Sequence, residues 1–199
     1  QILRVISGSA KGKRLKAPRG MATRPITDLI KGALFSVWGS RVIGARLLDL
    51  FAGSGSVGIE ALSRGARQVV FVDNSREAIQ AIKDNLSNCR FSPDLPVIRG
   101  DVVRVLQTLD QRQEKFDLVY LDPPFSNERV FNQVMSALAD VDILAPGAVV
   151  VIRAPRRKEM PDFGVLHKYR QSEYGESCLH YYRRQEEDPK DDGNFPDIR

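Results

Sequence analysis

The segment of residues 47–62 joins an apolar strand pattern, a glycine-rich loop and the start of a helical pattern. Gly53, Gly55 and Gly58 have the spacing G-x-G-x-x-G, and Asp73 follows Gly53 by twenty residues at the end of the next apolar run. This combination is typical of a Rossmann-like fold, in which glycines let the backbone approach an adenosine-containing cofactor and the acidic residue accepts from ribose hydroxyls. It predicts such a cofactor and leaves NAD and S-adenosylmethionine both open.

Strand and helix patterns alternate along the rest of the chain, which predicts an α/β fold with a mostly parallel sheet covered on both faces. We expect strands at residues 46–51, 68–72, 96–99, 116–121, 148–153, 163–170 and 177–184. We expect helices at residues 28–38, 56–64, 75–88, 102–110 and 127–139, the first of them capped by Thr27 or Asp28. Near the start of the chain, residues 3–7 and 14–17 predict a small basic β-hairpin.

Two observations separate the candidate cofactors. NAD enzymes usually carry a second mononucleotide half or a substrate domain, whereas only about a hundred residues follow the second half-sheet here. Asp49 stands four residues before Gly53, at the predicted tip of the strand. A carboxylate there would attract a cationic aminoacyl group and repel a pyrophosphate. Both observations favour S-adenosylmethionine.

A second motif, Asp122-Pro123-Pro124-Phe125, follows the apolar run of residues 116–121. The prolines remove two backbone donors, so an amino group placed there meets the Asp122 carboxylate and a backbone carbonyl of Asp122 or Pro123. Phe125 offers a face on which an extruded base can stack, worth roughly 1–3 kcal/mol. A proline-rich turn at a strand end is the alternative for the tetrapeptide alone. With the glycine loop, the motif predicts a methyltransferase whose catalytic residues are Asp122, Pro123 and Phe125.

The expected cofactor contacts lie at the ends of the predicted strands and are those of Asp49, Gly53, Ser54, Gly55, Asp73, Asn74 and Asp101. Asp49 and the glycine loop are expected near the methionine part, and Asp73 on the ribose hydroxyls. Asn74 is expected beside the adenine, with Asp101 accepting from the adenine amino group. The alternatives are a turn role for Asp73 and a helix-cap role for Asp101.

Positive charge is concentrated at the start of the chain. The first 46 residues carry ten basic side chains and one acid, Asp28, whereas the whole chain has a net charge of +5. A basic arm on a mildly acidic body suggests contact with phosphates. The RNA contacts that we expect are Arg4, Lys11, Lys13, Arg14 and Arg24. The alternative is a solvated basic hairpin.

The remaining features bound the class of protein. Cys89 and Cys178 are isolated and fit no metal-ligand spacing, so we expect reduced thiols and no metal. The absence of an 18-residue apolar run and of a signal peptide predicts a soluble, cytoplasmic protein with no membrane partner, or an organellar protein if a transit segment preceded Gln1. We also expect a monomer. We expect an RNA-contacting hairpin and helix over residues 1–40, a methyltransferase domain over 41–184 and an acidic disordered tail over 185–199.

These motifs occur together with shorter segments along the chain: RVISG at 4–8, KGKRL at 11–15, TRPITD at 23–28, LF at 34–35, LDLFAGSG at 48–55, GIEALSRGA at 58–66 and DPPF at 122–125. In this combination the chain resembles, over about residues 2–184, the bacterial RsmD-like enzymes that methylate a guanine N2 in small-subunit ribosomal RNA. The resemblance implies a class I S-adenosylmethionine-dependent methyltransferase fold. It implies seven strands, six parallel and the last antiparallel, with a small N-terminal β-hairpin.

The resemblance also implies a reaction and a partner. Methyl transfer from S-adenosylmethionine to the exocyclic N2 amine of a guanine in 16S ribosomal RNA would leave S-adenosylhomocysteine. The partner would be ribosomal RNA, free or within a small-subunit assembly particle. Family members usually continue the Thr-Asp segment with Arg-x-x-Glu, whereas Leu29 and Gly32 stand at those positions here. Contacts to a cofactor lid or to RNA at those positions are therefore expected to differ.

Three other functions are compatible with parts of the pattern. A DNA adenine-N6 methyltransferase shares the logic of the DPPF motif but normally carries a target-recognition region, for which this chain has no room. A protein glutamine methyltransferase prefers Asn at the position of Asp122 and does not need a basic arm. A non-catalytic RNA-binding assembly factor on a methyltransferase scaffold would not need Asp49, Asp73, Asp122 and Phe125 together.

Overall fold

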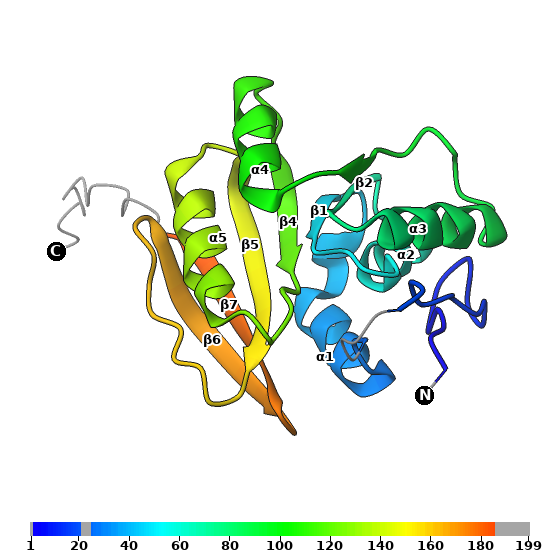
Figure 1. Cartoon of the computed structure of the whole chain (residues 1–199), viewed down its shortest axis with the longest axis horizontal. Coiled ribbons are helices and arrows are strands. Elements are labelled where there is room, and N and C mark those ends of the chain that lie inside the picture. Colours follow the sequence, from blue (N-terminus) through cyan, green and yellow to red (C-terminus); the bar gives the residue numbers. More distant parts are fainter. Residues whose placement is uncertain (1, 21–24, 186–199) are drawn as a thin grey trace, which may run out of the picture.

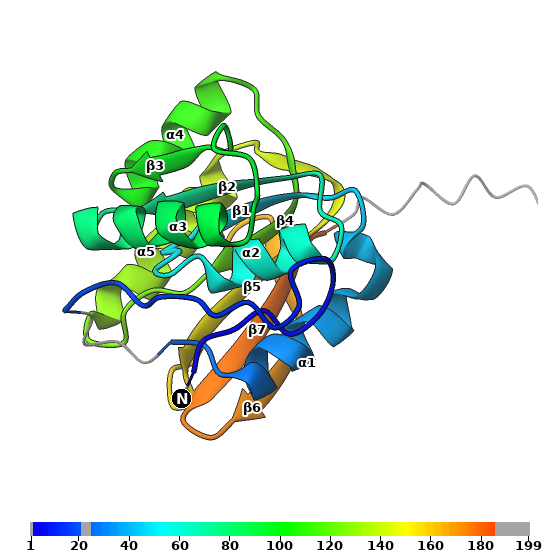
Figure 2. The same ribbon diagram turned by 90° about the vertical axis from the view of Figure 1, so that its right-hand side faces the viewer.

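The structure, a computed structural model, describes residues 2–20 and 25–185, which form a layered α/β fold (Figures 1 and 2). The strands are β1 (Arg46–Leu50), β2 (Gln68–Asp73), β3 (Val97–Arg99), β4 (Phe116–Leu121), β5 (Leu144–Pro155), β6 (Leu166–Tyr174) and β7 (Ser177–Arg184). The helices are α1 (Asp28–Trp38), α2 (Ser56–Ser63), α3 (Arg76–Asn88), α4 (Val102–Gln111) and α5 (Glu128–Asp140), with a 3₁₀ turn η1 (Gly39–Val42) after α1. No helix in the described ranges is long and apolar enough to span a bilayer.

The seven strands form one sheet in the order β3-β2-β1-β4-β5-β7-β6. The five strands from β3 to β5 pair in parallel, and β7 pairs antiparallel with both β5 and β6. The expected mostly parallel sheet with an antiparallel last strand is confirmed. The largest differences from the predicted bounds are in β5 and β6. β5 begins at Leu144, four residues early, and ends at Pro155. β6 begins at Leu166, because a backbone-bonded turn with Phe163 occupies the residues before it, and continues to Tyr174 instead of residue 170.

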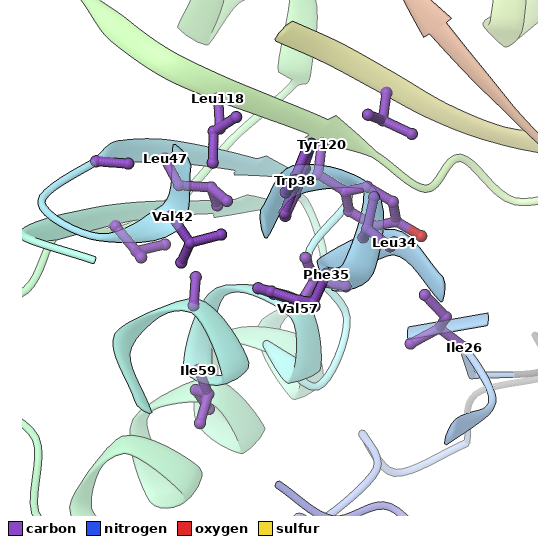
Figure 3. Close-up of a cluster of buried hydrophobic side chains, with 14 of the residues drawn as sticks. Ile26, Leu34, Phe35, Trp38, Val42, Leu47, Val57, Ile59, Leu118 and Tyr120 are labelled. Atoms are coloured by element: carbon purple, nitrogen blue, oxygen red, sulfur yellow. The ribbon is translucent and has the colours of Figure 1, made fainter. Parts of the chain in front are cut away.

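The two faces of the sheet bury separate hydrophobic clusters because neighbouring strand residues point to opposite sides. In β1, Leu47 belongs to the cluster under α1, α2 and α3, whereas Leu48 belongs to the cluster under α4 and α5. Figure 3 shows the first cluster, in which the Trp38 ring meets the Tyr120 ring edge-on at 6.5 Å between centres. This packing anchors α1 beside the end of β4.

The expected N-terminal β-hairpin is not formed. Residues Arg4 and Arg14 make one isolated antiparallel bridge, and no strand is present in residues 2–20. This arm, residues 3–17, pairs with itself only locally: Val5 N–H donates to the Lys13 carbonyl and Leu15 N–H to the Leu3 carbonyl, each at 2.9 Å. Other donors leave the arm: Ser9 N–H donates to the Ser63 carbonyl at 2.8 Å, and Ala10 N–H donates to the Ser63 hydroxyl at 2.9 Å. The arm is therefore docked along α2, and its own pairing does not extend into strands (Figure 2).

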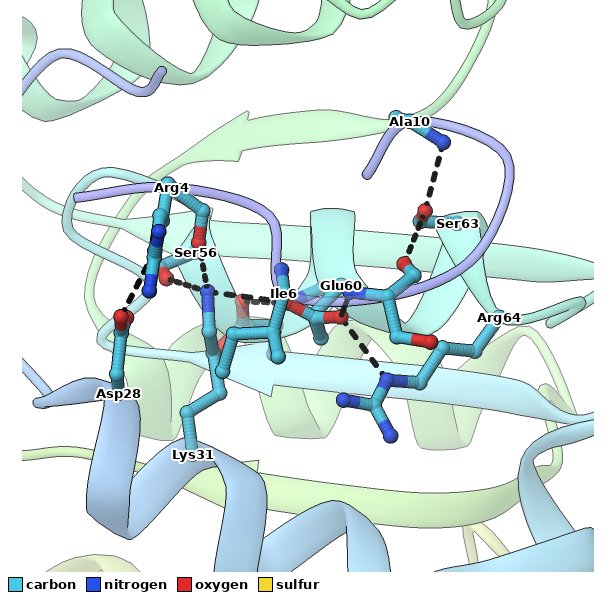
Figure 4. A network of polar contacts seen from close by, with 12 residues as sticks. Arg4, Ile6, Ala10, Asp28, Lys31, Ser56, Glu60, Ser63 and Arg64 are labelled. Atoms are coloured by element: carbon cyan, nitrogen blue, oxygen red, sulfur yellow. Dashed lines mark hydrogen bonds and ion pairs between the residues drawn. The ribbon is translucent and has the colours of Figure 1, made fainter. Parts of the chain in front are cut away.

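A buried ion pair holds the arm, α1 and α2 together (Figure 4). Lys31 Nζ lies 3.1 Å from Glu60 Oε1, and the two side chains are 2% and 0% exposed. The same ammonium donates to the Arg4 carbonyl at 2.6 Å and to the Ser56 hydroxyl at 3.0 Å. The Glu60 carboxylate also accepts from the backbone N–H groups of residues 6 and 7. Because Ser56 begins α2, this network links the arm to the glycine loop.

Candidate active site

An open cleft of about 800 Å³ lies where β1 and β4 end. β1 is flanked by β2 on one side and β4 on the other, so the strand order reverses here. Open α/β sheets bind their ligands at such a point. The cleft brings together two motifs that are about 70 residues apart in the chain. Its wall includes Asp49, Gly53, Ser54, Asp122, Pro123, Phe125 and Arg153.

The glycine loop follows the local geometry that its spacing predicts. Gly53 and Gly55 have φ angles of 57° and 77°, in the region that glycine adopts most easily. Gly58 lies in the first turns of α2, where a Cβ would overlap the Phe71 ring of β2. The third glycine therefore permits close packing of the helix on the sheet. The loop is held in a shape that leaves Gly53 and Ser54 facing the cleft.

Asp49 is a buried carboxyl at the base of the cleft. It is 2% exposed, and its Oδ2 accepts from the Gly58 N–H at 3.1 Å. Burial raises the pKa of Asp49 well above its usual range, and the charges of Asp122 and Asp73 add to this rise, whereas the Gly58 N–H opposes it. A cation bound beside Asp49 would relieve this cost, so the site fits the cationic aminoacyl end of S-adenosylmethionine.

Asp73 ties two segments together at the end of β2. Its Oδ2 accepts from the Gly53 N–H at 3.0 Å, and its Oδ1 accepts from the Ser75 N–H at 2.9 Å. The turn role considered for Asp73 is thus present, and the carboxylate also supports the glycine loop. Each carboxylate oxygen can accept a further bond, so its role toward ribose hydroxyls stays a prediction.

Asn74 and Asp101 lie beyond the cleft wall described above. Asn74 is exposed, and its carbonyl accepts from Arg99 Nε at 3.3 Å. The Asp101 carboxylate accepts from the Arg104 N–H at 3.1 Å and so caps α4, the alternative considered for it. The adenine contacts assigned to these two residues stay predictions.

Asp122 follows β4 and lines the cleft with 16% of its side chain exposed. Arg153 Nε on β5 lies 3.0 Å from both Asp122 oxygens, and the Tyr120 hydroxyl donates to Asp122 Oδ2 at 3.0 Å. Burial raises the pKa of Asp122, and the Arg153 guanidinium opposes that rise. Burial also raises the pKa of Tyr120 well above its usual range, so the phenol stays a donor.

Phe125 stands beside this carboxylate at the mouth of the cleft. Its ring centre lies 6.2 Å from that of Phe131, and the Arg153 guanidinium carbon lies 5.4 Å from the ring centre. Arg153 and Tyr120 were not among the residues predicted for the site. Both residues lie in apolar strand patterns that contain no recognisable motif. The one available signal was that Arg153 is a single arginine in an apolar strand, which indicates that its charge is paired with a buried partner.

The basic arm reaches the edge of the cleft, because Leu3, Ala17 and Pro18 form part of its wall. Three cations of the arm, Lys11, Lys13 and Arg14, are exposed and are called the three arm cations below. Arg4 is 58% exposed in its ion pair with Asp28, at 2.9 Å. Arg24, also expected to contact RNA, lies outside the described residues, as does the predicted tail beyond residue 185.

The two positions at which the sequence departs from the RsmD-like pattern lie on α1. Leu29 is 71% exposed, and a Cβ added at Gly32 would meet no atom within 4 Å. Neither residue contributes to the described wall of the cleft, although Ile30 on the same helix and its N-cap Thr27 do. The expected difference in contacts to a cofactor lid or to RNA at these two positions stays a prediction.

Comparisons with known proteins identify a family and similar solved structures. The family described as conserved hypothetical protein 95 matches residues 3–183. A protein of Bacillus subtilis named "Putative rRNA methyltransferase YlbH" is 38% identical over 183 residues, which cover 92% of this chain and 99% of that protein. The "Ribosomal RNA small subunit methyltransferase D" of Haemophilus influenzae is 31% identical over 79% of this chain and 81% of its own length. The solved structure of "Putative methyltransferase yhhF from Escherichia coli" superposes with a TM-score of 0.80 at 27% identity, covering 93% of this chain and 99% of that one.

Proposed function

This chain belongs to the family described as conserved hypothetical protein 95, and we propose that it methylates the exocyclic N2 amine of a guanine in small-subunit ribosomal RNA. It is an S-adenosylmethionine-dependent methyltransferase related to ribosomal RNA small subunit methyltransferase D. One observation carries the proposal. The buried acid Asp49, suited to a cationic cofactor, and the acceptor Asp122, suited to an amine, line the same cleft.

The proposed chemistry follows from the weak nucleophilicity of the target. The lone pair of a guanine N2 is conjugated into the ring, so the enzyme must direct it at the methyl group. Asp122 and the Pro123 carbonyl, each accepting one N–H, would turn the nitrogen toward tetrahedral geometry. Phe125 would stack on the extruded base. Catalysis is then a matter of positioning and electrostatics, with no covalent enzyme intermediate.

S-adenosylmethionine, when bound, supplies an electrophilic methyl group on a sulfonium. Transfer to N2 would break the carbon–sulfur bond and form the N2–carbon bond, which would leave neutral sulfur in the product S-adenosylhomocysteine. The extra proton then leaves N2. Asp49, by its charge, and the glycine loop would hold the methionine part, and Asp73 would hold the ribose hydroxyls. No metal is required for this chemistry.

The proposed partner is ribosomal RNA, which the basic arm would contact. The three arm cations are exposed, and the arm ends at the wall of the cleft. Phosphate contacts there would place the RNA near the two proposed acceptors, Asp122 and the Pro123 carbonyl, without reading the RNA sequence. A docked arm with a fixed backbone costs less conformational entropy on binding than a free tail would.

The test is methyl transfer from labelled S-adenosylmethionine to ribosomal RNA, DNA or protein, followed by identification of the modified base. N2-methylguanine in RNA is the expected product. N6-methyladenine in DNA would support the DNA enzyme instead. Absence of transfer to every substrate, with RNA binding retained, would support the non-catalytic assembly factor.

Variants of the acceptor motif locate the site. Asp122→Ala should lower kcat by roughly 10²-fold or more and leave cofactor affinity unchanged, because the lost acceptor acts on the amine in the reacting complex. Phe125→Ala should chiefly weaken capture of the base. Asp122→Asn keeps an acceptor oxygen without the charge. Wild-type turnover in Asp122→Ala would show that the proposed site is wrong.

A further inference from the structure

Arg153, on β5, contacts both Asp122 and Phe125 of the DPPF motif that follows β4. β4 and β5 pair in parallel through Leu121 and Ile152, so Asp122 and Arg153 follow as the next neighbours along the two strands. Arg153 Nε lies 3.0 Å from each Asp122 oxygen, and the two side chains are 9% and 16% exposed. Arg153 Nη1 donates to the Ser177 hydroxyl on β7 at 3.3 Å. The guanidinium is thus held from two directions.

The same guanidinium also contacts the stacking residue of the site. Its central carbon lies 5.4 Å from the centre of the Phe125 ring, within the range of a cation–π contact. The carboxylate that would accept from the amine and the ring that would stack on the base are both held by one side chain. A rigid guanidinium suits this task, because its planar fork loses less entropy per hydrogen bond than a lysine does.

The surroundings of Asp122 show what this cation opposes. Burial raises the pKa of Asp122, and the Arg153 guanidinium is the largest opposing influence. Tyr120 on β4 donates one hydrogen bond to the carboxylate, and two other acids, Asp49 from β1 and Glu176 from the turn before β7, line the same cleft. In the described part of the chain, Arg153 is the cation that forms an ion pair with Asp122.

We propose that Arg153 is a positioning residue that keeps Asp122 ionised and aimed at the target amine. The inference rests on the proposed function of Asp122 as the amine acceptor. A protonated Asp122 would present an O–H to the amine and lose acceptor capacity, whereas the paired carboxylate accepts only. The pairing also opposes the rise that burial causes in the pKa of Asp122. It orients N2 by hydrogen bonding, and the proton released after transfer passes to water.

The direct test measures the titration of Asp122 without any substrate. Protein labelled with ¹³C at the aspartate carboxyls is titrated by NMR, with the Asp122 signal assigned from its loss in Asp122→Asn. Arg153→Gln should move the Asp122 midpoint to higher pH, because the opposing cation is gone while the burial remains. Arg153→Lys should restore part of the wild-type midpoint. An unchanged midpoint in Arg153→Gln would overturn the proposal.

Arg156→Gln is the matched control. Arg156 lies just beyond the same strand and pairs with Glu173, but the two side chains are 55% and 46% exposed. This variant removes the same charge from a solvated pair, and it should leave the Asp122 midpoint in place. A shift equal to that of Arg153→Gln would mean that general charge, rather than the contact, sets the ionisation of Asp122, and would overturn the proposal.

The functional readout is the single-turnover rate of methyl transfer to RNA as a function of pH. Arg153→Gln should be about tenfold slower than the wild type at pH 6, and the ratio should shrink as the pH rises and Asp122 ionises. A ratio that does not change with pH would leave Arg153 with a structural role only. Arg153→Met, which keeps apolar length, replaces the Gln variant if that variant does not fold. Absence of transfer by the wild type would refute the proposed function, and the NMR titration keeps that result apart from a failure of Arg153.

Discussion

Replacement of Glu60 by Gln tests whether the buried ion pair with Lys31 holds the arm on α2. The carboxylate lies 3.1 Å from Lys31 Nζ and accepts from Arg64 Nε at 2.9 Å. It also accepts from two arm N–H groups, those of Ile6 at 2.8 Å and Ser7 at 3.1 Å. The amide of Gln keeps one acceptor oxygen but points an NH₂ group at these donors. Lys31 then stays buried without its counter-charge.

The expected loss is large because both partners are buried. Removing one partner of a buried pair costs about 3–5 kcal/mol, since the remaining charge is left uncompensated. The exposed Arg4–Asp28 pair, at 58% and 31% exposure, is expected to contribute only about 0–1 kcal/mol. Glu60→Gln should therefore lower the free energy of unfolding by about 3–5 kcal/mol. At roughly 2–4 °C per kcal/mol for a chain of this size, Tm should fall by about 6–20 °C.

The loss should depend on pH in a defined direction. Burial lowers the pKa of Lys31 from its ordinary value of 10.5, and the Glu60 charge opposes that change. Without Glu60 the folded-state pKa falls further, so the unfolded chain binds more protons and stability rises with pH. The deficit of Glu60→Gln should accordingly shrink as the pH approaches 10.5, where Lys31 becomes neutral in both states.

Urea unfolding followed by circular dichroism, at neutral and alkaline pH, measures these differences, with Asp28→Asn as the control for an exposed pair. A loss in Glu60→Gln no larger than that in Asp28→Asn would refute the reasoning. So would a deficit that grows with pH. Either result would mean that water or another group compensates Lys31.

Three further predictions test other parts of the molecule. Asp73→Ala should weaken S-adenosylmethionine binding by about 1.5–3 kcal/mol in calorimetry, and unchanged affinity in a folded variant would remove Asp73 from the site. Replacing the three arm cations by alanine should lower the slope of log K against log salt for RNA binding by roughly 0.7–0.9 per lost contact, with cofactor affinity unaffected; a constant slope would make the arm a solvated surface. Gly58→Ala should destabilise the fold by about 1–3 kcal/mol through overlap with β2, whereas Gly32→Ala, in open space, should stabilise it by roughly 0.5–1 kcal/mol. Equal melting temperatures for these two glycine variants would contradict the packing argument.

Much of the sheet domain was predictable from local signals. The alternation of apolar strands and amphipathic helices indicated the order of the elements, and the glycine spacing indicated the turn before α2, because both depend on residues within a few positions of one another. The cap role of Asp101 was visible as an alternative for the same reason, since its partner is the N–H of Arg104. The DPPF motif likewise marked the place where β4 ends.

The arm shows where sequence patterns are insufficient. Residues 3–7 and 14–17 predicted a hairpin because their partners were sought nearby, and that prediction is wrong. The two segments share a few backbone hydrogen bonds, such as Leu15 N–H to the Leu3 carbonyl, but the N–H groups of Ile6 and Ser7 donate to Glu60, more than fifty residues away in the chain. A backbone donor takes the partner that packing brings close, and no local pattern specifies that the partner lies on α2.

The surroundings of Asp122 were likewise predictable only in part from the sequence. The sequence by itself determined that a carboxylate and an aromatic ring follow β4, because four adjacent residues carry that information. Only the tertiary structure decided that Arg153, 31 positions away, pairs with Asp122. The physical reason is that side-chain periodicity specifies which face of a strand is buried, whereas the neighbours across that face depend on the order and register of all the strands in the sheet.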